Sequence, residues 1–142
     1  MAAMKKRILV VDDEPDFTYS IRMGLETLGS YEVREENDAN NAKRAARDFM
    51  PHLILLDIMM PELDGSEVAS AIREDSKLRH IPVVFCTALV SKKEVRNGSC
   101  TIGGNVFLPK PFDLDKLIEC IEELTPHVKE DPAAAADVVP AP

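Results

Sequence analysis

Short runs of apolar and β-branched residues alternate along this chain with longer segments in which apolar residues recur at helical spacing. Such alternation is typical of βαβ units, which build a parallel sheet covered by helices on both faces. The sequence therefore predicts an α/β domain with a five-stranded parallel sheet. The predicted strands span residues 7–12, 31–35, 52–57, 82–87 and 106–108.

The predicted strands differ in polarity, and this difference indicates where each lies in the sheet. Residues 52–57 include four consecutive large apolar residues, so this strand is expected in the middle. Residues 31–35 alternate between polar and apolar side chains, as an edge strand does. Between the strands, Pro15 suits the start of a helix, Gly29 suits its end, and Asp113 suits the cap of the last helix. The other predicted helices span 15–28, 38–48, 66–75 and 91–99.

The charge and the cysteines exclude several functions. The 142 residues include 17 Lys and Arg against 25 Asp and Glu, a formal net charge of −8. We therefore expect no direct binding to nucleic acid and none to anionic membranes, since both attract clustered basic residues. No apolar run is long enough for a signal peptide or a membrane span, so no membrane insertion is expected. Cys86, Cys100 and Cys120 are an odd number at wide spacing, which predicts reduced thiols in a cytoplasmic protein.

The end of the chain differs in composition from the rest. From residue 129 the sequence is rich in Ala and Pro, and it has few large apolar residues to offset the entropy cost of ordering. We predict one folded domain over residues 1–128 and a flexible tail or linker over residues 129–142. The sequence leaves open whether the chain acts alone or is a segment of a longer protein.

Carboxylates, a hydroxyl and an ammonium occur where the predicted strands end. Asp12 and Asp13 lie at the end of the first strand, Asp57 ends the third, Thr87 ends the fourth, and Lys110 follows the fifth. The carboxyl ends of parallel strands share one edge of the sheet, which is where ligands bind in open α/β sheets. These side chains are therefore expected to converge.

The converging carboxylates predict a magnesium site that also receives a phosphoryl group. Neighbouring carboxylates repel one another, and a hard divalent cation relieves this repulsion by taking oxygen ligands. A carboxylate such as Asp57 can attack a phosphoryl donor to form an acyl phosphate, while Lys110 and Thr87 bind phosphoryl oxygens. The expected cofactor is Mg²⁺, for which Mn²⁺ can substitute.

Four motifs in this order resemble the receiver domains of two-component response regulators. They are Val-Asp-Asp-Glu-Pro at 11–15, Leu-Leu-Asp-Ile-Met-Met-Pro-Glu-Leu-Asp-Gly at 55–65, Thr87-Ala88, and Lys110-Pro111-Phe112. The resemblance covers about residues 5–125. It implies a CheY-like, flavodoxin-like doubly wound (βα)5 fold with strand order 2-1-3-4-5. It also implies a phosphoprotein of phosphorelay signal transduction that assists its own phosphoryl transfer and dephosphorylation without being an enzyme in the usual sense.

The resemblance implies a role for each carboxylate that matches a motif. Asp57 is the expected phosphoacceptor, and its donor is a sensor histidine kinase or a phosphotransfer protein. Asp12 and Asp13 are the expected Mg²⁺ carboxylates, together with Asp57 and the backbone carbonyl of Met59. The magnesium site and the phosphoacceptor are thus expected to coincide.

The resemblance also implies a conformational switch. Thr87 and Lys110 are expected to contact the phosphoryl group, and the bond between Lys110 and Pro111 is expected to be cis. Thr87 and Phe107 are the expected switch residues, which alter a face built from residues 91–99, the fifth strand and the last helix. A downstream protein is expected to bind this face. The segment 91–99 and the residues just after it carry three glycines, which predicts either a marginal helix or an irregular loop.

Three other functions fit parts of the pattern. A phosphatase or phosphotransferase of the haloacid-dehalogenase kind also uses a strand-end Asp, but it has a second acid two residues later, where this chain has Met59. A nucleotide-binding module would need a glycine-rich phosphate loop after the first strand, which is absent from the sequence. A receiver-like scaffold that binds partners without phosphorylation remains open.

Overall fold

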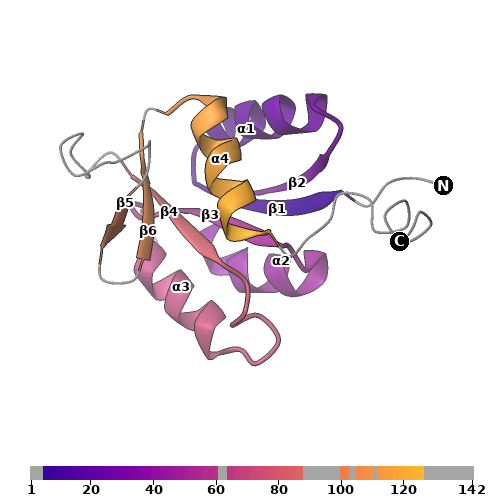
Figure 1. Cartoon of the computed structure of the whole chain (residues 1–142). Helices are drawn as coiled ribbons and strands as arrows, with labels where there is room; N and C mark the ends of the chain where they lie inside the picture. Colours follow the sequence, from indigo (N-terminus) through magenta and orange to yellow (C-terminus); the bar gives the residue numbers. More distant parts are fainter. Residues whose placement is uncertain (1–4, 61–63, 88–99, 103–104, 111, 127–142) are drawn as a thin grey trace, which may run out of the picture.

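The structure is a computed structural model, and it describes residues 5–60, 64–87, 100–102, 105–110 and 112–126. In this part of the chain, six strands form one sheet in the order β2-β1-β3-β4-β6-β5 (Figure 1). All neighbouring pairs are parallel except β5 with β6. The strands are β1 (Lys6–Val11), β2 (Tyr31–Glu36), β3 (Leu53–Asp57), β4 (Val83–Thr87), β5 (Cys100–Ile102) and β6 (Asn105–Pro109).

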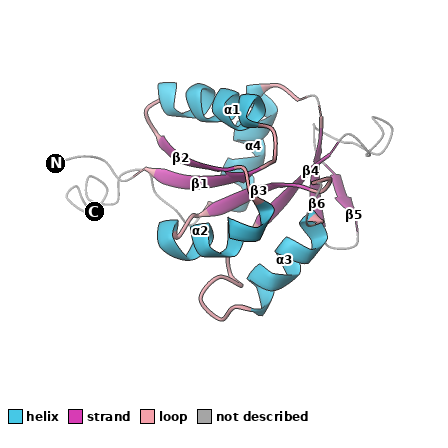
Figure 2. Cartoon of the chain, turned by 180° about the vertical axis from the view of Figure 1, so that it is seen from behind, coloured by secondary structure: helices cyan, strands magenta, loops and turns pink. Residues whose placement is uncertain are grey.

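Helices cover both faces of the sheet (Figure 2). Successive side chains of a strand point to opposite faces, so the apolar strands supply two separate cores. Ile8 and Val10 of β1 belong to the core under the first and last helices, whereas Leu9 and Val11 belong to the core under the middle two. The helices are α1 (Pro15–Thr27) and α4 (Leu114–Leu124) on one face, and α2 (Ala42–Phe49) and α3 (Gly65–Glu74) on the other.

The predicted parallel sheet is confirmed, with one addition. Strands β1, β2, β3, β4 and β6 correspond to the five predicted strands, and their order is 2-1-3-4-5 with β2 at one edge. The prediction missed β5, a short antiparallel strand that pairs with β6 and forms the other edge. It lies in a stretch that was expected to hold only a marginal helix or a loop. The predicted helix 91–99 itself, the residue Pro111 and the tail 129–142 lie outside the described residues.

The helix ends follow the local sequence. Pro15 occupies the first turn of α1, and Gly29 beyond its end has a φ of +86°, a left-handed conformation that costs glycine little. The side chain of Asp113 accepts a hydrogen bond from the backbone of Lys116, which confirms it as the cap of α4. The predicted helix 38–48 is partly wrong, because its first residues form a separate 3₁₀ turn, η1 (Ala39–Asn41), ahead of α2.

Candidate functional site

Asp12 and Asp57 are neighbours because β1 and β3 are adjacent parallel strands. Val11 pairs with Leu56, so the next residue of each chain segment, Asp12 and Asp57, lies at the same carboxyl end of the sheet. Both residues are buried, at 0% and 6% exposure. The order of strands along the chain reverses between β1 and β3, and such switch points are where ligands bind in open α/β sheets.

Three carboxylates meet at this switch point. Asp12, Asp13 and Asp57 each offer an oxygen, and these oxygens lie within 4.8 Å of one another. Asp13 is exposed, so the group is open to solvent on one side. Oxygen donors with a solvent-facing side suit Mg²⁺, which keeps several water ligands. The residues present therefore fit the predicted cation, and the three predicted carboxylates are close enough to share it.

Lys110 supplies the positive charge of the site. Its backbone N–H donates to the carbonyl of Thr87 at 2.9 Å, which ties the residue after β6 to the end of β4. Its Nζ donates to Oδ2 of Asp12 at 2.7 Å and lies 3.8 Å from Oδ2 of Asp57. Burial alone would lower the pKa of Lys110, but the hydrogen bond to Asp12 and the nearby carboxylate charges outweigh burial and raise it. Lys110 is therefore a permanent cation at neutral pH.

The pKa of the Asp57 carboxyl group lies above its ordinary value of 3.8. Burial raises its pKa first, and the charge of Asp12 raises it further, to about 6. Lys110 and the backbone N–H of Met59, which lies 3.3 Å from Oδ1, act in the opposite direction. The charge of Lys110 therefore does not fully offset burial and the repulsion between the carboxylates, and a further cation would stabilise their ionised forms.

This raised pKa predicts a pH-dependent stability difference between the wild type and Asp57→Asn. A carboxyl group with a higher pKa in the folded state than its ordinary 3.8 binds more protons when folded, so its contribution to the free energy of unfolding falls as the pH rises from about 4 to about 6. In metal-free buffer above that window, Asp57→Asn is expected to be more stable than the wild type by about 1–2 kcal/mol, after allowance for solvent screening.

Urea unfolding at a series of pH values measures this difference. At pH 4 the two proteins should be nearly equally stable, because neither carries the charge at position 57. Addition of Mg²⁺ at neutral pH should reduce or reverse the difference. Parallel stability curves for the two proteins from pH 4 to pH 7 would show that Asp57 titrates normally.

The two predicted switch residues lie on neighbouring strands. Thr87 is the last residue of β4 and is 2% exposed. It directly follows Cys86, which pairs with Asp57 of the neighbouring strand β3. Phe107 of β6 is half-buried and stacks on Phe85 of β4, with ring centroids 5.3 Å apart. Phe107 therefore packs on the face covered by α2 and α3. Its predicted movement on phosphorylation stays a prediction.

Two residues near the site, Asn37 and Phe17, were missed by the sequence reasoning. Asn37, just after β2, donates from Nδ2 to the carbonyl of Asp12 at 2.8 Å, and the strand-end argument applied to β2 would have found it. Glu14, which the motif at 11–15 already contained, places a carboxylate oxygen 3.9 Å from Lys110 Nζ. Phe17 of α1 lies with its ring centroid 4.2 Å from the same Nζ, and no motif signals this contact.

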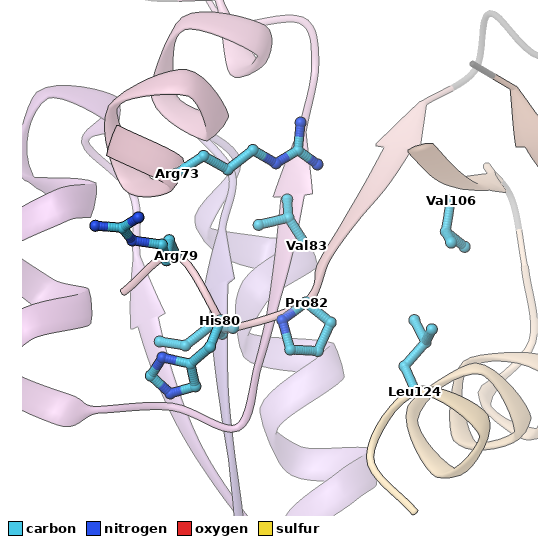
Figure 3. A pocket seen from close by; sticks show the side chains of 8 residues that line it. Arg73, Arg79, His80, Pro82, Val83, Val106 and Leu124 are labelled. Carbon is cyan, nitrogen blue, oxygen red and sulfur yellow. The ribbon is translucent and has the colours of Figure 1, made fainter. Parts of the chain in front are cut away.

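A separate cavity of about 270 Å³ lies at the opposite ends of the strands (Figure 3). Pro82 and Val83 mark the start of β4 there, and Val106 of β6 faces Leu124 of α4. None of its lining residues is a carboxylate, so this cavity has no part in binding the cation. It is lined by Arg73, Arg79, His80, Ile81, Pro82, Val83, Val106 and Leu124.

The fold and the carboxylates at its switch point define a class: a CheY-like doubly wound α/β domain with an acidic site. A family model described as the response regulator receiver domain matches residues 8–122. The chemotaxis protein CheY4 of Vibrio cholerae has a similar structure, with a TM-score of 0.71 at 25% identity over 84% of this chain and 98% of that one. This chain belongs to the response regulator receiver domain family, the receivers of two-component systems.

Two curated relatives differ in how much of their length is matched. The polar-differentiation response regulator DivK of Brucella anthropi is 32% identical over 122 residues, which cover 84% of this chain and 95% of DivK. The DNA-binding dual master transcriptional regulator RpaA of Synechocystis sp. is 33% identical over 129 residues, which cover 91% of this chain. This chain spans about half of RpaA, 53% of its length. Among the helices that the structure describes, none is long and apolar enough to cross a membrane.

Proposed function

We propose that this chain is a phosphorylation-activated receiver that accepts a phosphoryl group on Asp57 from a sensor histidine kinase or a phosphotransfer protein. The observation that carries the proposal is the surroundings of Asp57. Its carboxylate ends a central strand and lies 3.8 Å from the ammonium of Lys110. One of its oxygens also lies within 4.8 Å of an oxygen from each of Asp12 and Asp13. Phosphoryl transfer to an aspartate needs three kinds of group: a nucleophilic carboxylate, a positively charged side chain and carboxylates that bind a metal cation. Here they are Asp57, Lys110, and the pair Asp12 and Asp13.

The proposed transfer is an in-line displacement at phosphorus. An Oδ of ionised Asp57 forms a new bond to the phosphorus atom, and the bond from phosphorus to the donor's imidazole nitrogen breaks. The leaving imidazole keeps the electron pair and takes up a proton. Lys110, already 3.8 Å from Oδ2 of Asp57, would donate to one of the phosphoryl oxygens. Thr87 would donate its hydroxyl to another.

The cofactor in this proposal is Mg²⁺. Asp12, Asp13 and Asp57 would hold it with the backbone carbonyl of Met59. When bound, the cation supplies positive charge that favours the ionised form of Asp57 and offsets the charge of the phosphoryl oxygens. Mn²⁺ would serve the same purpose with the same oxygen ligands.

The proposed output is a change in a protein-binding face. Phosphoryl contacts to Thr87 and Lys110 would favour one arrangement of the site, and Phe107 on the adjacent strand would follow. In the described residues this face comprises β6 and α4, and residues 91–99 would complete it. The relative DivK, covered over 95% of its length, is named a response regulator, which supports a response-regulator role for this chain. Cys86 and Cys120 are free thiols, which supports a cytoplasmic location.

The experiment that tests the proposal is intact-mass measurement after incubation with a small acyl phosphate or phosphoramidate. With Mg²⁺ present, the wild type is expected to gain one phosphoryl group. Removal of the metal with a chelator is expected to slow this gain by at least about 100-fold, because the carboxylate charge then opposes the approach of the anionic donor. Equal labelling with and without Mg²⁺ would contradict the metal assignment.

The same experiment separates the receiver from its main alternative. A receiver-like scaffold would bind Mg²⁺ without gaining mass. Isothermal titration with Mg²⁺ alone therefore accompanies the labelling. Binding of the cation without labelling would refute the proposed phosphoacceptor and favour the scaffold.

A further inference from the structure

The ammonium of Lys110 lies between carboxylates on one side and an aromatic ring on the other. Its Nζ is 2.7 Å from Asp12, 3.8 Å from Asp57 and 3.9 Å from Glu14. It also lies 4.2 Å from the ring centroid of Phe17, within the range of a cation–π contact. The side chain of Lys110 is only 19% exposed. The ring of Phe17 is the one uncharged group among these four neighbours.

The ring of Phe17 is itself held in place. Phe17 lies in the first turn of α1, where its backbone N–H donates to the carbonyl of Glu14 at 3.1 Å. Phe112, two residues after Lys110, meets it edge to face, with centroids 6.0 Å apart and an interplanar angle of 90°. Both rings are half-buried against the core shared by α1 and α4. The ring therefore presents a fixed face toward Lys110.

We propose that Phe17 is a positioning residue that holds the Lys110 ammonium over the phosphoacceptor site through a cation–π contact. This inference rests on the proposed function, because it concerns how Lys110 reaches the phosphoryl group. In the structure Lys110 donates a hydrogen bond to Asp12. Phosphoryl transfer requires it to donate instead to an oxygen of the phosphoryl group that Asp57 accepts. A ring attracts the ammonium from behind without accepting a proton, so it limits outward movement and leaves the N–H groups free to change acceptor.

The sharpest test changes the charge distribution of the ring and keeps its shape. Phenylalanine carrying one, two or three fluorine atoms is incorporated at position 17, since each fluorine weakens the negative face of the ring. With a small acyl phosphate and Mg²⁺, the rate constant of labelling is expected to fall stepwise, by about 3- to 10-fold for the trifluoro residue, as the strength of a partly buried cation–π contact allows. Phe17→Tyr, which keeps an electron-rich ring, is expected to stay within about 2-fold of the wild type.

A matched series at Tyr19 provides the control. Tyr19 lies on the same helix but is 57% exposed and is outside the Lys110 contacts given above. Replacing it by phenylalanine and then by the fluorinated residues is expected to leave the rate of labelling by the small donor unchanged. A fall of equal size in both series would overturn the inference, because the effect would then come from α1 in general.

A second measurement reads the contact without any phosphorylation. In the wild type, the side-chain protons of Lys110 are expected to resonate upfield of those of other lysines, because they lie over a ring face. Phe17→Leu should move them back to the ordinary range. The role of Phe17 alone would be overturned if the wild type labels normally but the rate of labelling does not change with the number of fluorine atoms at position 17. It would also be overturned if the side-chain protons of Lys110 resonate in the ordinary range for lysine. Absence of labelling in the unmodified protein would overturn the proposed function as well.

Discussion

Asp57→Asn is expected to abolish phosphorylation by small donors and by a phosphorylated kinase, with a loss of more than about 1,000-fold in rate, as removal of a nucleophile produces. The amide has the size of the carboxylate but no free negative charge with which to attack phosphorus. The surroundings should remain intact, because position 57 would lose one of three crowded carboxylates. Intact mass after incubation with the donor and Mg²⁺ gives the result directly.

A carboxylate on α2 supplies the control for this variant. Asp48 is 58% exposed in its side chain and pairs only loosely with Arg44, at 4.0 Å. Asp48→Asn makes the same chemical change and is expected to label at the wild-type rate. Labelling of Asp57→Asn at a comparable rate would place the phosphoryl group on another residue, and peptide mapping would then identify it.

Gly65→Ala is expected to destabilise the fold by about 2–3 kcal/mol, the size of effect seen when a tightly packed position is overfilled. A Cβ at Gly65 would overlap the carbonyl oxygen of Asp57 and lie 2.8 Å from Cα of Ile58. Both are backbone atoms, which cannot move aside as a flexible side chain can. Because the hydrogen bond from Gly65 N–H to the Ile58 carbonyl also fixes this approach, the added methyl group should displace the backbone of Asp57.

This displacement should appear in two measurements. Urea unfolding is expected to show the lower stability, and Mg²⁺ titration of the folded variant is expected to show weaker binding. Gly24→Ala is the matched control: a Cβ there would lie 3.2 Å from the terminal methyl groups of Leu114, which can rotate away. Since alanine also favours the interior of α1, this control should stay within about 0.5 kcal/mol of the wild type. Equal effects in both variants would argue against a special close approach at Gly65.

Much of the sheet could be predicted, because periodicity and polarity act locally. Four central apolar residues made the strand ending at Asp57 a buried one, and the polar alternation of 31–35 made it an edge strand. Strand β5 was missed because three residues carry too little periodicity to distinguish a strand from a loop. The Gly103–Gly104 dipeptide between β5 and β6 was the available signal, since such pairs are typical of tight hairpins.

The sequence predicted which strand-end residues lie together at the candidate site. It did not predict the distances and hydrogen bonds between them. Strand ends in a parallel sheet meet at one edge, so Asp12, Asp57 and Lys110 could be grouped from their positions alone. The grouping could not show that Lys110 donates to Asp12 while lying 3.8 Å from Asp57. Nor could it identify Phe17, because an apolar residue in the first turn of a helix is ordinarily read as core.

The sequence by itself therefore determined the fold class, the order of the elements and the residues that carry charge at the strand ends. These follow from side-chain periodicity and turn chemistry, which depend on near neighbours in the chain. Only the tertiary structure decided which charges touch, how far the pKa of Asp57 rises, and which ring lies over Lys110. Coulomb energies and desolvation depend on distances of a few ångströms between residues far apart in the chain, such as Asp12 and Lys110, which are 98 positions apart. Such distances are set when the sheet and its helices pack together.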